Sequence, residues 1–268
     1  MTRREAEGYI DEASSIPSIE WVSFTGGEPF LLPELLRALV PYATDSGLRT
    51  ECVTNCAWAT SREKAAEELE KLAGLGLDAL NVSADDFHQA QIPFERVRSC
   101  YDAAKELGLK TVIMCATSRS SRFRLSEVAR LLGGDIYILG GDRPERFSAI
   151  GVESAFTPVG RATCLPVDER ITGESPIEGP CEAVLRDIGV RPRGDVMPCC
   201  SASSRLEALK AGNISNGGLS RLLEAAWKQP VFNVLAMEGP IGLSRGKGAR
   251  DGSYVNRCHL CHELLKRC

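Results

Sequence analysis

The sequence has no long apolar run, no excess of positive charge and no apolar segment at its start. Its hydrophobic runs are short and interrupted by charged residues, so we expect no membrane-spanning helix. Met1-Thr2-Arg3 leads into a polar helix and not into an apolar signal core, which indicates a cytoplasmic protein. The formal net charge of -4, from 32 Lys and Arg against 36 Asp and Glu, leaves no electrostatic footprint for nucleic acid.

The first 51 residues of the chain contain no cysteine. The first cysteine is Cys52, although the 268 residues contain eleven. An odd count in a long chain without an export signal argues against a disulfide framework, so metal ligation better explains at least some of the thiols. Four cysteines lack the spacing of metal ligands and are interpreted as structural, namely Cys52, Cys56, Cys100 and Cys115.

A hydrophobic content of 43% is enough to bury one barrel-sized core or two small ones. Between residues 21 and 139, short β-rich runs that are mostly apolar on both faces alternate with amphipathic helical segments, as in a parallel sheet covered by helices. The predicted strands are Trp21–Phe24, Arg49–Thr54, Ala79–Ser83, Thr111–Cys115 and Ile136–Leu139. Glycine stops at Gly47, Gly76 and Gly108 end the helices between them. The pattern predicts an α/β fold with repeated β/α units.

The pattern changes after Leu139, where Gly140-Gly141-Asp142-Arg143-Pro144 opens a stretch rich in Gly and Pro. We therefore expect a domain boundary near residue 150. Beyond it the sequence predicts a hairpin over Ala183–Val196, with its turn at Arg191–Asp195, and a helix around Leu219–Lys228.

The most informative residues follow the first predicted strand, in Thr25-Gly26-Gly27-Glu28-Pro29. Loops after the strands of a parallel barrel gather at one face and carry its reactive groups. Two glycines let the backbone approach a ligand closely, and the carboxylate beside them can accept hydrogen bonds from an ammonium group. A glycine turn that enters a helix, with Pro29 in its first turn, explains the same residues equally well.

Gly26-Gly27-Glu28-Pro29 at the end of a strand resembles the GGEP motif of the radical S-adenosylmethionine (SAM) superfamily. The resemblance implies that these four residues bind the amino group of the methionine moiety of SAM. Thr54-Asn55 is similar to the TN step of that family, and Ser83-Ala84-Asp85-Asp86-Phe87-His88 is similar to its polar loop near the ribose and carboxylate of SAM. Asn55, Ser83 and Asp85 are then further SAM contacts. His88 suits either an acid-base role or the start of a helix.

A second group of residues lies near the C-terminus. Cys258-His259-Leu260-Cys261 is a Cys-x-x-Cys pair, Cys199-Cys200 follows the predicted hairpin, and Cys181 lies just before that hairpin. Thiolates from three segments could meet around zinc or an iron-sulfur cluster, and the spacing alone does not distinguish the two.

The same cysteine pattern resembles the auxiliary-cluster domain called twitch or SPASM. The resemblance implies a 4Fe-4S cluster on Cys181, Cys199, Cys258 and Cys261, with Cys200 as an alternative to Cys199. A complete SPASM domain has enough cysteines for two clusters. Too few cysteines remain in this sequence for a second cluster, so we expect the one-cluster twitch form.

Radical SAM proteins also carry a Cys-x-x-x-Cys-x-x-Cys loop after the first barrel strand, and this sequence contains no such run. In the family that loop holds the 4Fe-4S cluster that binds and cleaves SAM. We therefore expect an N-terminally shortened radical SAM enzyme whose intact form holds this second cluster, with a degenerate, non-catalytic relative as the alternative. The sequence as written is expected not to cleave SAM.

Taken together, the sequence predicts a partial (β/α) TIM-type barrel without its first strand over residues 1–150, and a small Cys-rich α+β auxiliary-cluster domain over residues 151–268. The resemblance implies hydrogen abstraction from a peptide or small-molecule substrate, with flavodoxin or ferredoxin as the reductant. The competing hypothesis is a non-catalytic module that binds a peptide or partner protein and whose fold is stabilised by zinc or an iron-sulfur cluster.

Overall fold

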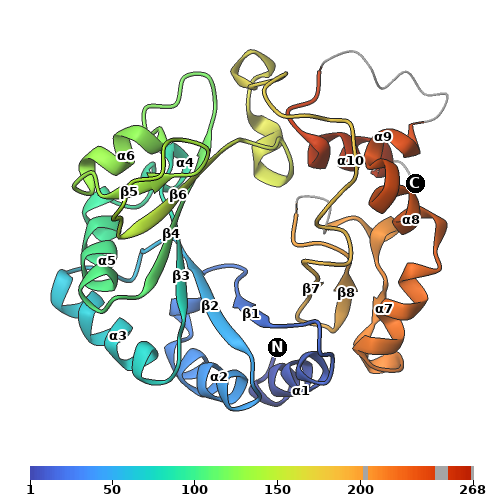
Figure 1. The fold of residues 1–268 in the computed structure, drawn as a ribbon, viewed down its shortest axis with the longest axis horizontal. Coiled ribbons are helices and arrows are strands. Elements are labelled where there is room, and N and C mark those ends of the chain that lie inside the picture. The colour runs from blue at the N-terminus through green and yellow to red at the C-terminus, as the bar shows by residue number, and fades with distance from the viewer. Residues whose placement is uncertain (202–204, 245–252, 267–268) are drawn as a thin grey trace. The chain divides into compact units, whose positions relative to one another are not determined.

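The computed structural model describes residues 1–201, 205–244 and 253–266 (Figure 1). The chain divides into two compact units, Thr2–Ser154 and Ala155–Cys268. No helix among the described residues is both long and apolar enough to cross a membrane.

The first unit is built on an open sheet of six strands in the order β1-β2-β3-β4-β6-β5. The strands are β1 (Trp21–Phe24), β2 (Arg49–Thr54), β3 (Ala79–Ser83), β4 (Lys110–Thr117), β5 (Ile136–Ile138) and β6 (Ala149–Ala155). The pairs β1–β2, β2–β3, β3–β4 and β5–β6 are parallel. This arrangement confirms the predicted α/β fold and is consistent with a partial barrel.

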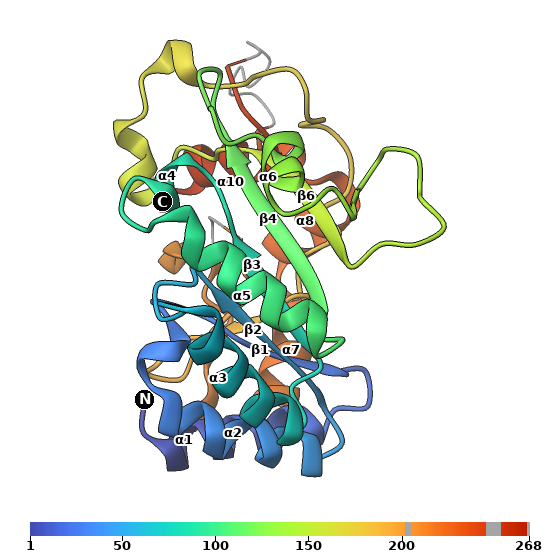
Figure 2. The same cartoon turned by 90° about the vertical axis from the view of Figure 1, so that its left-hand side faces the viewer.

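The helices of this unit lie along one face of the curved sheet, as Figures 1 and 2 show. They are α1 (Arg3–Ser14), α2 (Pro33–Asp45), α3 (Arg62–Gly74), α4 (Asp86–Gln89), α5 (Phe94–Glu106) and α6 (Leu125–Leu131). Leu69, Leu80, Val97 and Ile113, from two helices and two strands, are fully buried between the layers. In β2 and β4 buried residues alternate with half-buried ones. The two faces of these strands are therefore not equally covered, contrary to the expectation from their apolar composition.

The helix ends follow from the glycines that the sequence singled out. Gly47 has φ 83°, its N–H bonds to the carbonyl of Thr44 (2.9 Å), and the N–H of Leu48 bonds to the carbonyl of Ala43 (3.0 Å). This pair of bonds is a Schellman motif, and it satisfies carbonyls that the helix leaves without a partner. The corresponding bonds recur at Gly76 and Gly108, so the predicted stops are confirmed at all three positions.

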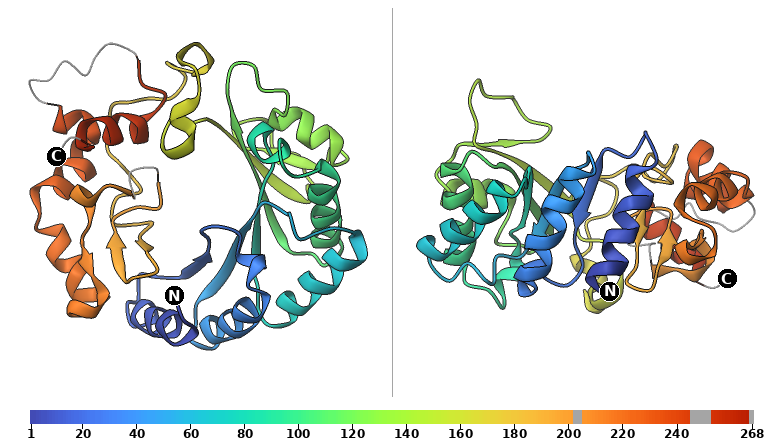
Figure 3. Two further views of the ribbon diagram at one scale, coloured as in Figure 1. Left: turned by 180° about the vertical axis from the view of Figure 1, so that it is seen from behind. Right: turned by 90° about the horizontal axis from the view of Figure 1, so that it is seen from below.

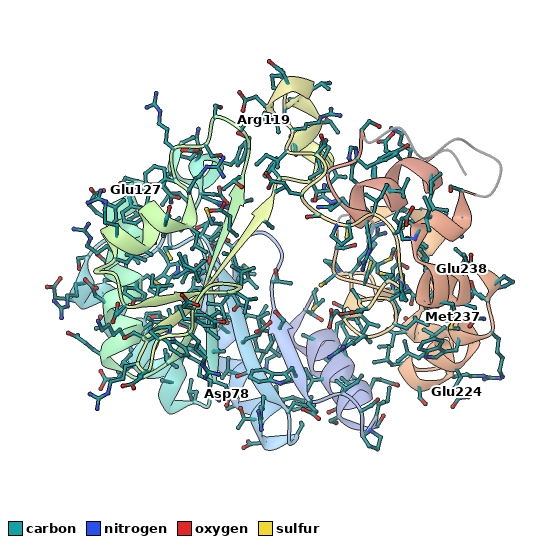
Figure 4. All side chains as sticks on the ribbon, turned by 45° about the horizontal axis from the view of Figure 1, so that its top comes forward. Asp78, Arg119, Glu127, Glu224, Met237 and Glu238 are labelled. Atoms are coloured by element: carbon teal, nitrogen blue, oxygen red, sulfur yellow. The ribbon has the colours of Figure 1, made fainter. Side chains whose placement is uncertain are left out.

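A carboxylate joins the start of β3 to β2. Asp78, labelled in Figure 4, accepts a hydrogen bond from the backbone N–H of Thr50 (2.9 Å). This bond helps to fix the register in which Glu51 lies opposite Ala79. The register places the carboxyl ends of β1, β2 and β3 at the same edge of the sheet, since the three strands are parallel neighbours.

One strand was not predicted. β6 follows the glycine- and proline-rich stretch and pairs with β5, with Ile136 opposite Ala149, and it lies between β4 and β5 in the sheet. Its run is interrupted by Gly151, where an added Cβ would lie 2.9 Å from the side chain of Leu125. The glycine therefore lets α6 approach the sheet, and it also weakens the strand pattern in the sequence.

The second unit combines a small antiparallel sheet with short helices. Its strands are β7 (Gly189–Val190), β8 (Asp195–Met197) and β9 (Gly212–Asn213), and its α-helices are α7 (Leu219–Trp227), α8 (Pro230–Glu238), α9 (Pro240–Leu243) and α10 (Arg257–Leu265). Figure 3 shows the small sheet alongside the orange and red helices. Met237 of α8 leaves 76% of its surface exposed (Figure 4).

The predicted hairpin and the predicted helix of this unit are both present. The hairpin begins at Gly189 and not at Ala183, because Leu185 has φ 57° and the chain before β7 forms turns. α7 lies within the predicted range.

Candidate cofactor and metal sites

The loop after β1 contains two glycines with positive φ. Gly26 and Gly27 have φ values of 89° and 63°, and an added Cβ at either would meet no atom within 4 Å. They are therefore needed for their backbone conformation, in the region that disfavours other residues. The 3₁₀ helix η1 (Pro29–Leu31) follows, and Glu28 caps it by accepting a hydrogen bond from the N–H of Phe30 (3.3 Å). The turn into a helix, one of the two sequence readings, is thus present.

The carboxylate of Glu28 also fastens this loop to the end of β2. Its Oε1 accepts a hydrogen bond from the hydroxyl of Thr54 (2.9 Å), and its Oε2 accepts one from the backbone N–H of Asn55 (2.8 Å). An ionised carboxylate has about four lone-pair positions, and the chain occupies three of them, including the bond from Phe30. The half-buried carboxylate keeps capacity for one further donor.

Thr54 is the residue that sequence reasoning missed. It is buried, and its hydroxyl accepts hydrogen bonds from the N–H of Cys56 (3.0 Å) and the indole Nε1 of Trp58 (2.9 Å) while it donates to Glu28. All its hydrogen-bonding positions are therefore in use. The ring of Trp58 in turn stacks on that of Phe30, with centroids 4.1 Å apart. The signal was present in the Thr54-Asn55 step, but only the asparagine was taken as a candidate.

Asn55 acts here through its backbone and as a turn residue. Its side-chain Oδ1 accepts a hydrogen bond from the N–H of Ala57 (2.9 Å). This local bond is typical of an Asx turn. Cys56, the next residue, has φ 62°, in the left-handed region that non-glycine residues rarely adopt.

The loop after β3 is organised by Asp85. One carboxylate oxygen caps α4 by accepting hydrogen bonds from the N–H groups of Phe87 and His88 (both 3.0 Å), and it lies 2.9 Å from Nδ1 of His88. The other oxygen accepts a bond from the N–H of Ala116 (3.4 Å) in β4. Asp85 is only 3% exposed. The structure therefore uses this carboxylate to hold the loop, and its contact with SAM stays a prediction.

His88 occupies the first turn of α4, which is the helix-start role that the sequence left open. Ser83 is half-buried and ends β3. Because β1, β2 and β3 are adjacent and parallel, Glu28, Asn55 and Ser83 come from the same edge of the sheet. The topology brings the predicted SAM contacts together in this way, although their roles stay predictions.

The four cysteines of the first unit are all buried. Burial raises the pKa of Cys52 to about 12 and that of Cys115 to about 12. Burial and a hydrogen bond with Cys100 also raise the pKa of Cys56 well above its ordinary value. Thiols that stay protonated are poor nucleophiles and poor metal ligands, so these residues fit the structural role predicted for them.

The cysteine pair of the second unit lies at the start of α10. Cys258 and Cys261 are three residues apart and therefore share a helix face. Asn256 caps this helix by accepting a hydrogen bond from the N–H of His259 (2.9 Å). The amino end of a helix favours thiolate over thiol.

His259, inside the Cys-x-x-Cys pair, is packed into the interior of the second unit. It is 4% exposed, and its Nδ1 accepts a hydrogen bond from the N–H of Val255 (3.2 Å). Burial lowers the pKa of His259, so the ring is neutral at pH 7. The edge of the Tyr254 ring packs against it at a centroid distance of 5.4 Å.

The segment that carries Cys181 is fastened to two helices. The guanidinium of Arg257 donates to the carbonyls of Glu178 and Pro180 (both 2.9 Å), and the N–H of Cys181 donates to the carbonyl of Leu235 in α8 (2.9 Å). The bonds of Arg257 join the residues just before Cys181 to the residue just before Cys258. Three distant stretches of sequence are thereby connected.

The segment that carries Cys199 is joined by a backbone hydrogen bond to the chain that follows Cys181. The N–H of Leu185 donates to the carbonyl of Pro198 (2.7 Å), just before Cys199. Cys199 is buried and Cys200 is exposed. Of the two adjacent residues, Cys199 therefore faces the interior of this unit.

The thiols lie within electrostatic range of one another. Burial raises the pKa of Cys258, and the neighbouring thiols of Cys199, Cys181 and Cys200 raise it further, in that order of size. In the part of the chain that the structure describes, no three His, Cys, Asp or Glu side chains lie close enough together to hold a metal ion. The donor set consists of thiols that form no disulfide, and thiolate is the ligand that holds iron-sulfur clusters. The donor chemistry of these residues therefore fits such a cluster, and the set of thiols that would ligate it stays a prediction.

Two comparisons with protein families identify the class of each unit. Residues 1–119 match the model of the radical SAM superfamily, and residues 181–262 match the model of an iron-sulfur cluster-binding domain, SPASM. The fold and these matches thus define a protein with a parallel β/α unit of the radical SAM type and a cysteine-rich unit of the iron-sulfur cluster-binding type. The chain is a radical SAM protein with a SPASM-like domain, as its sequence predicted.

Individual relatives are more distant. The chain is 23% identical over 248 residues to YydG of Bacillus subtilis (strain 168), which is named as a peptide biosynthesis protein, and the match covers 89% of this chain and 73% of that protein. Among solved structures it is similar to a dihydrodipicolinate synthase family protein from Coccidioides immitis, with 15% identity and a TM-score of 0.36. That match covers 56% of this chain and about half, 54%, of the other. A likeness at this TM-score says nothing about function.

Proposed function

We propose that this protein works as a radical SAM enzyme that takes a hydrogen atom from a peptide substrate. The single observation that supports it best is the position of the Glu28 carboxylate. Hydrogen bonds hold it at the edge of a parallel sheet, beside two glycines that have free space around them. SAM, when bound to a reduced iron-sulfur cluster, supplies the radical for such a reaction. The 268 residues contain no Cys-x-x-x-Cys-x-x-Cys run, so the proposal assigns none of them to the cluster that cleaves SAM.

Glu28 would accept a hydrogen bond from the ammonium group of the methionine moiety. Thr54 and Asn55 hold the two carboxylate oxygens in place before the ligand arrives, so little side-chain freedom is lost on binding. Gly26 and Gly27 leave the neighbouring backbone accessible, and Pro29 starts η1 beside it. Asn55, Ser83 and Asp85 are assigned to the remainder of the SAM site, with Asp85 acting chiefly through the loop that it holds.

Cys181, Cys199, Cys258 and Cys261 would ligate one auxiliary 4Fe-4S cluster, which would supply an electron-transfer site. Cys199 is preferred to Cys200 because it is buried and because its thiol raises the pKa of Cys258 more than the thiol of Cys200 does. The hydrogen bonds of Arg257 would keep the Cys181 segment next to α10 while the cluster is loaded.

The peptide substrate rests on the likeness to YydG, whose name refers to peptide biosynthesis. Hydrogen abstraction of this kind needs an electron, and a flavodoxin or ferredoxin would be the reductant. Both partners are part of the proposal.

Binding of SAM to the anaerobically reconstituted protein tests the site directly. We expect Glu28→Gln to weaken the affinity at least tenfold, because a hydrogen bond between charged groups contributes about 1.5–3 kcal/mol. Glu34→Gln is the matched control, since that side chain is 85% exposed on α2 and should leave binding unchanged. Equal affinity of Glu28→Gln and the unsubstituted protein would contradict the SAM site.

A further inference from the structure

A serine hydroxyl lies between two of the candidate cluster ligands. Oγ of Ser201 is 3.1 Å from Sγ of Cys199. The same side chain hydrogen-bonds to Cys258. Cys199 and Cys258 lie 59 residues apart in sequence, on the segment after β8 and on α10, so one hydroxyl joins the thiols of two segments.

The direction of the bond to Cys258 can be assigned. A cysteine that ligates iron does so as a thiolate, so its sulfur can only accept a hydrogen bond once the cluster is bound. A thiolate has no proton to give, so the serine O–H must donate. The hydroxyl has a single proton, and once both cysteines ligate iron this proton can bond to either sulfur.

A donor at this place acts on the charge of a cluster. Reduction adds negative charge, part of which resides on the cysteine sulfurs, and a hydrogen bond to those sulfurs stabilises the reduced state. The hydrogen bonds to the sulfurs are among the features that set the reduction potential of an iron-sulfur cluster.

We propose that Ser201 donates its one hydrogen bond to a ligand sulfur, that of Cys199 or Cys258, and thereby raises the reduction potential of the auxiliary cluster. This inference rests on the proposed function, because it needs a cluster at these thiols. It makes Ser201 a residue that tunes the cluster and not a ligand. Ser201 is half-buried, so the bond is partly shielded from competing water.

The test compares Ser201→Ala and Ser201→Thr with the unsubstituted protein after anaerobic reconstitution. Iron and sulfide content is measured first, and the midpoint potential is then obtained by redox titration followed by electron paramagnetic resonance. We expect equal iron and sulfide in all three proteins. The reduction equilibrium of Ser201→Ala should shift toward the oxidised cluster about tenfold, or about 59 mV for one electron. Ser201→Thr keeps the hydroxyl and should restore the potential.

Pulsed resonance in D₂O gives a second readout. An exchangeable proton coupled to the cluster should be present in the unsubstituted protein and lost in Ser201→Ala. Ser215→Ala, at an exposed serine of the same unit, is the matched control and should change neither quantity.

Each outcome decides the inference. An unchanged potential in Ser201→Ala with full iron content would overturn it, and so would loss of iron in Ser201→Ala, because the serine would then serve assembly. If the unsubstituted protein itself holds iron without sulfide, or none, the auxiliary cluster of the proposed function fails, which is a different result from a cluster whose potential ignores Ser201.

Discussion

Thr54 shows how much of the proposed SAM site depends on one hydroxyl group. It donates to Glu28 and accepts from Cys56 and Trp58, at a position that is 1% exposed. Glu28 itself was predicted from its motif, because glycines before a carboxylate are visible in sequence. The hydroxyl that orients it was not predicted, because a threonine at the end of a strand is ordinary in composition and its partners come from another loop.

We expect Thr54→Val to lower the free energy of unfolding of the first unit by about 2–3 kcal/mol, because the buried N–H groups of Cys56 and Trp58 lose their acceptor. Valine keeps the shape of the side chain, so the change isolates the hydrogen bonds. Urea unfolding followed by Trp fluorescence measures it. Thr60→Val, at an exposed threonine in the same loop, should be nearly neutral. Equal stability of the two variants would show that the network is not formed.

Asp135 is a second residue whose charge matters to stability. Burial raises its pKa, but hydrogen bonds from Lys105, Ser148 and Tyr101 outweigh that effect and lower the pKa from 3.8 to about 2. A carboxyl with a lowered folded-state pKa stabilises the protein above pH 4, and this contribution is lost as the pH falls toward 2. The side chain is 31% exposed, so we discount the contribution to about 1–2 kcal/mol.

We therefore expect Asp135→Asn to be less stable than the unsubstituted protein at pH 7 by about 1–2 kcal/mol, with the difference shrinking between pH 4 and pH 2. Chemical denaturation over that pH range measures the difference. Asp142→Asn, at an exposed loop position, serves as the control and should show no such dependence. A difference that stayed constant with pH would contradict the assigned pKa.

At the scale of elements, the β/α repeat was predictable and one strand was not. Five strands and the glycine stops follow from local patterns of apolar residues and from the special backbone of glycine. β6 was missed because Gly151 and Glu153 break its apolar run. Its position between β4 and β5 depends on pairing between elements that are not neighbours in that order along the chain, which no local pattern encodes.

The glycine stops differ in what surrounds them, and this gives a matched pair of substitutions. Gly76 has φ 105°, and an added Cβ would lie 2.6 Å from Oγ1 of Thr44 on α2, whereas Gly108 has φ 67° and open space. Backbone strain alone should make Gly108→Ala cost about 1 kcal/mol. Gly76→Ala adds a steric clash and should cost about 2–4 kcal/mol. Thermal unfolding of both variants checks the order, and equal costs would contradict the close packing of α2 on the helix end after α3.

At the scale of the whole molecule, the family was predictable and the ligand set was predicted without being tested. Matches to a radical SAM model and to an iron-sulfur cluster-binding model lie on different parts of the chain, and each contains one of the two groups of residues that the sequence singled out. The preference for Cys199 over Cys200 stays a prediction and needed the fold, because adjacent side chains point in different directions and only the fold shows that Cys199 is the buried one.

That choice can be checked with single substitutions. We expect Cys199→Ala to lose the auxiliary cluster, because one of its four thiolates is removed, and Cys200→Ala to keep it, because that residue is exposed. The optical absorption of the cluster and the iron content after reconstitution distinguish the two variants. Retention in Cys199→Ala with loss in Cys200→Ala would reverse the assignment.

The measurement that tests the central claim most directly is the iron and acid-labile sulfide content of the anaerobically reconstituted protein, together with its zinc content. A 4Fe-4S cluster on the thiols of the second unit predicts about four iron and about four sulfide per chain and little zinc. Tightly bound zinc without sulfide would contradict the account, since the same thiols would then form a structural zinc site.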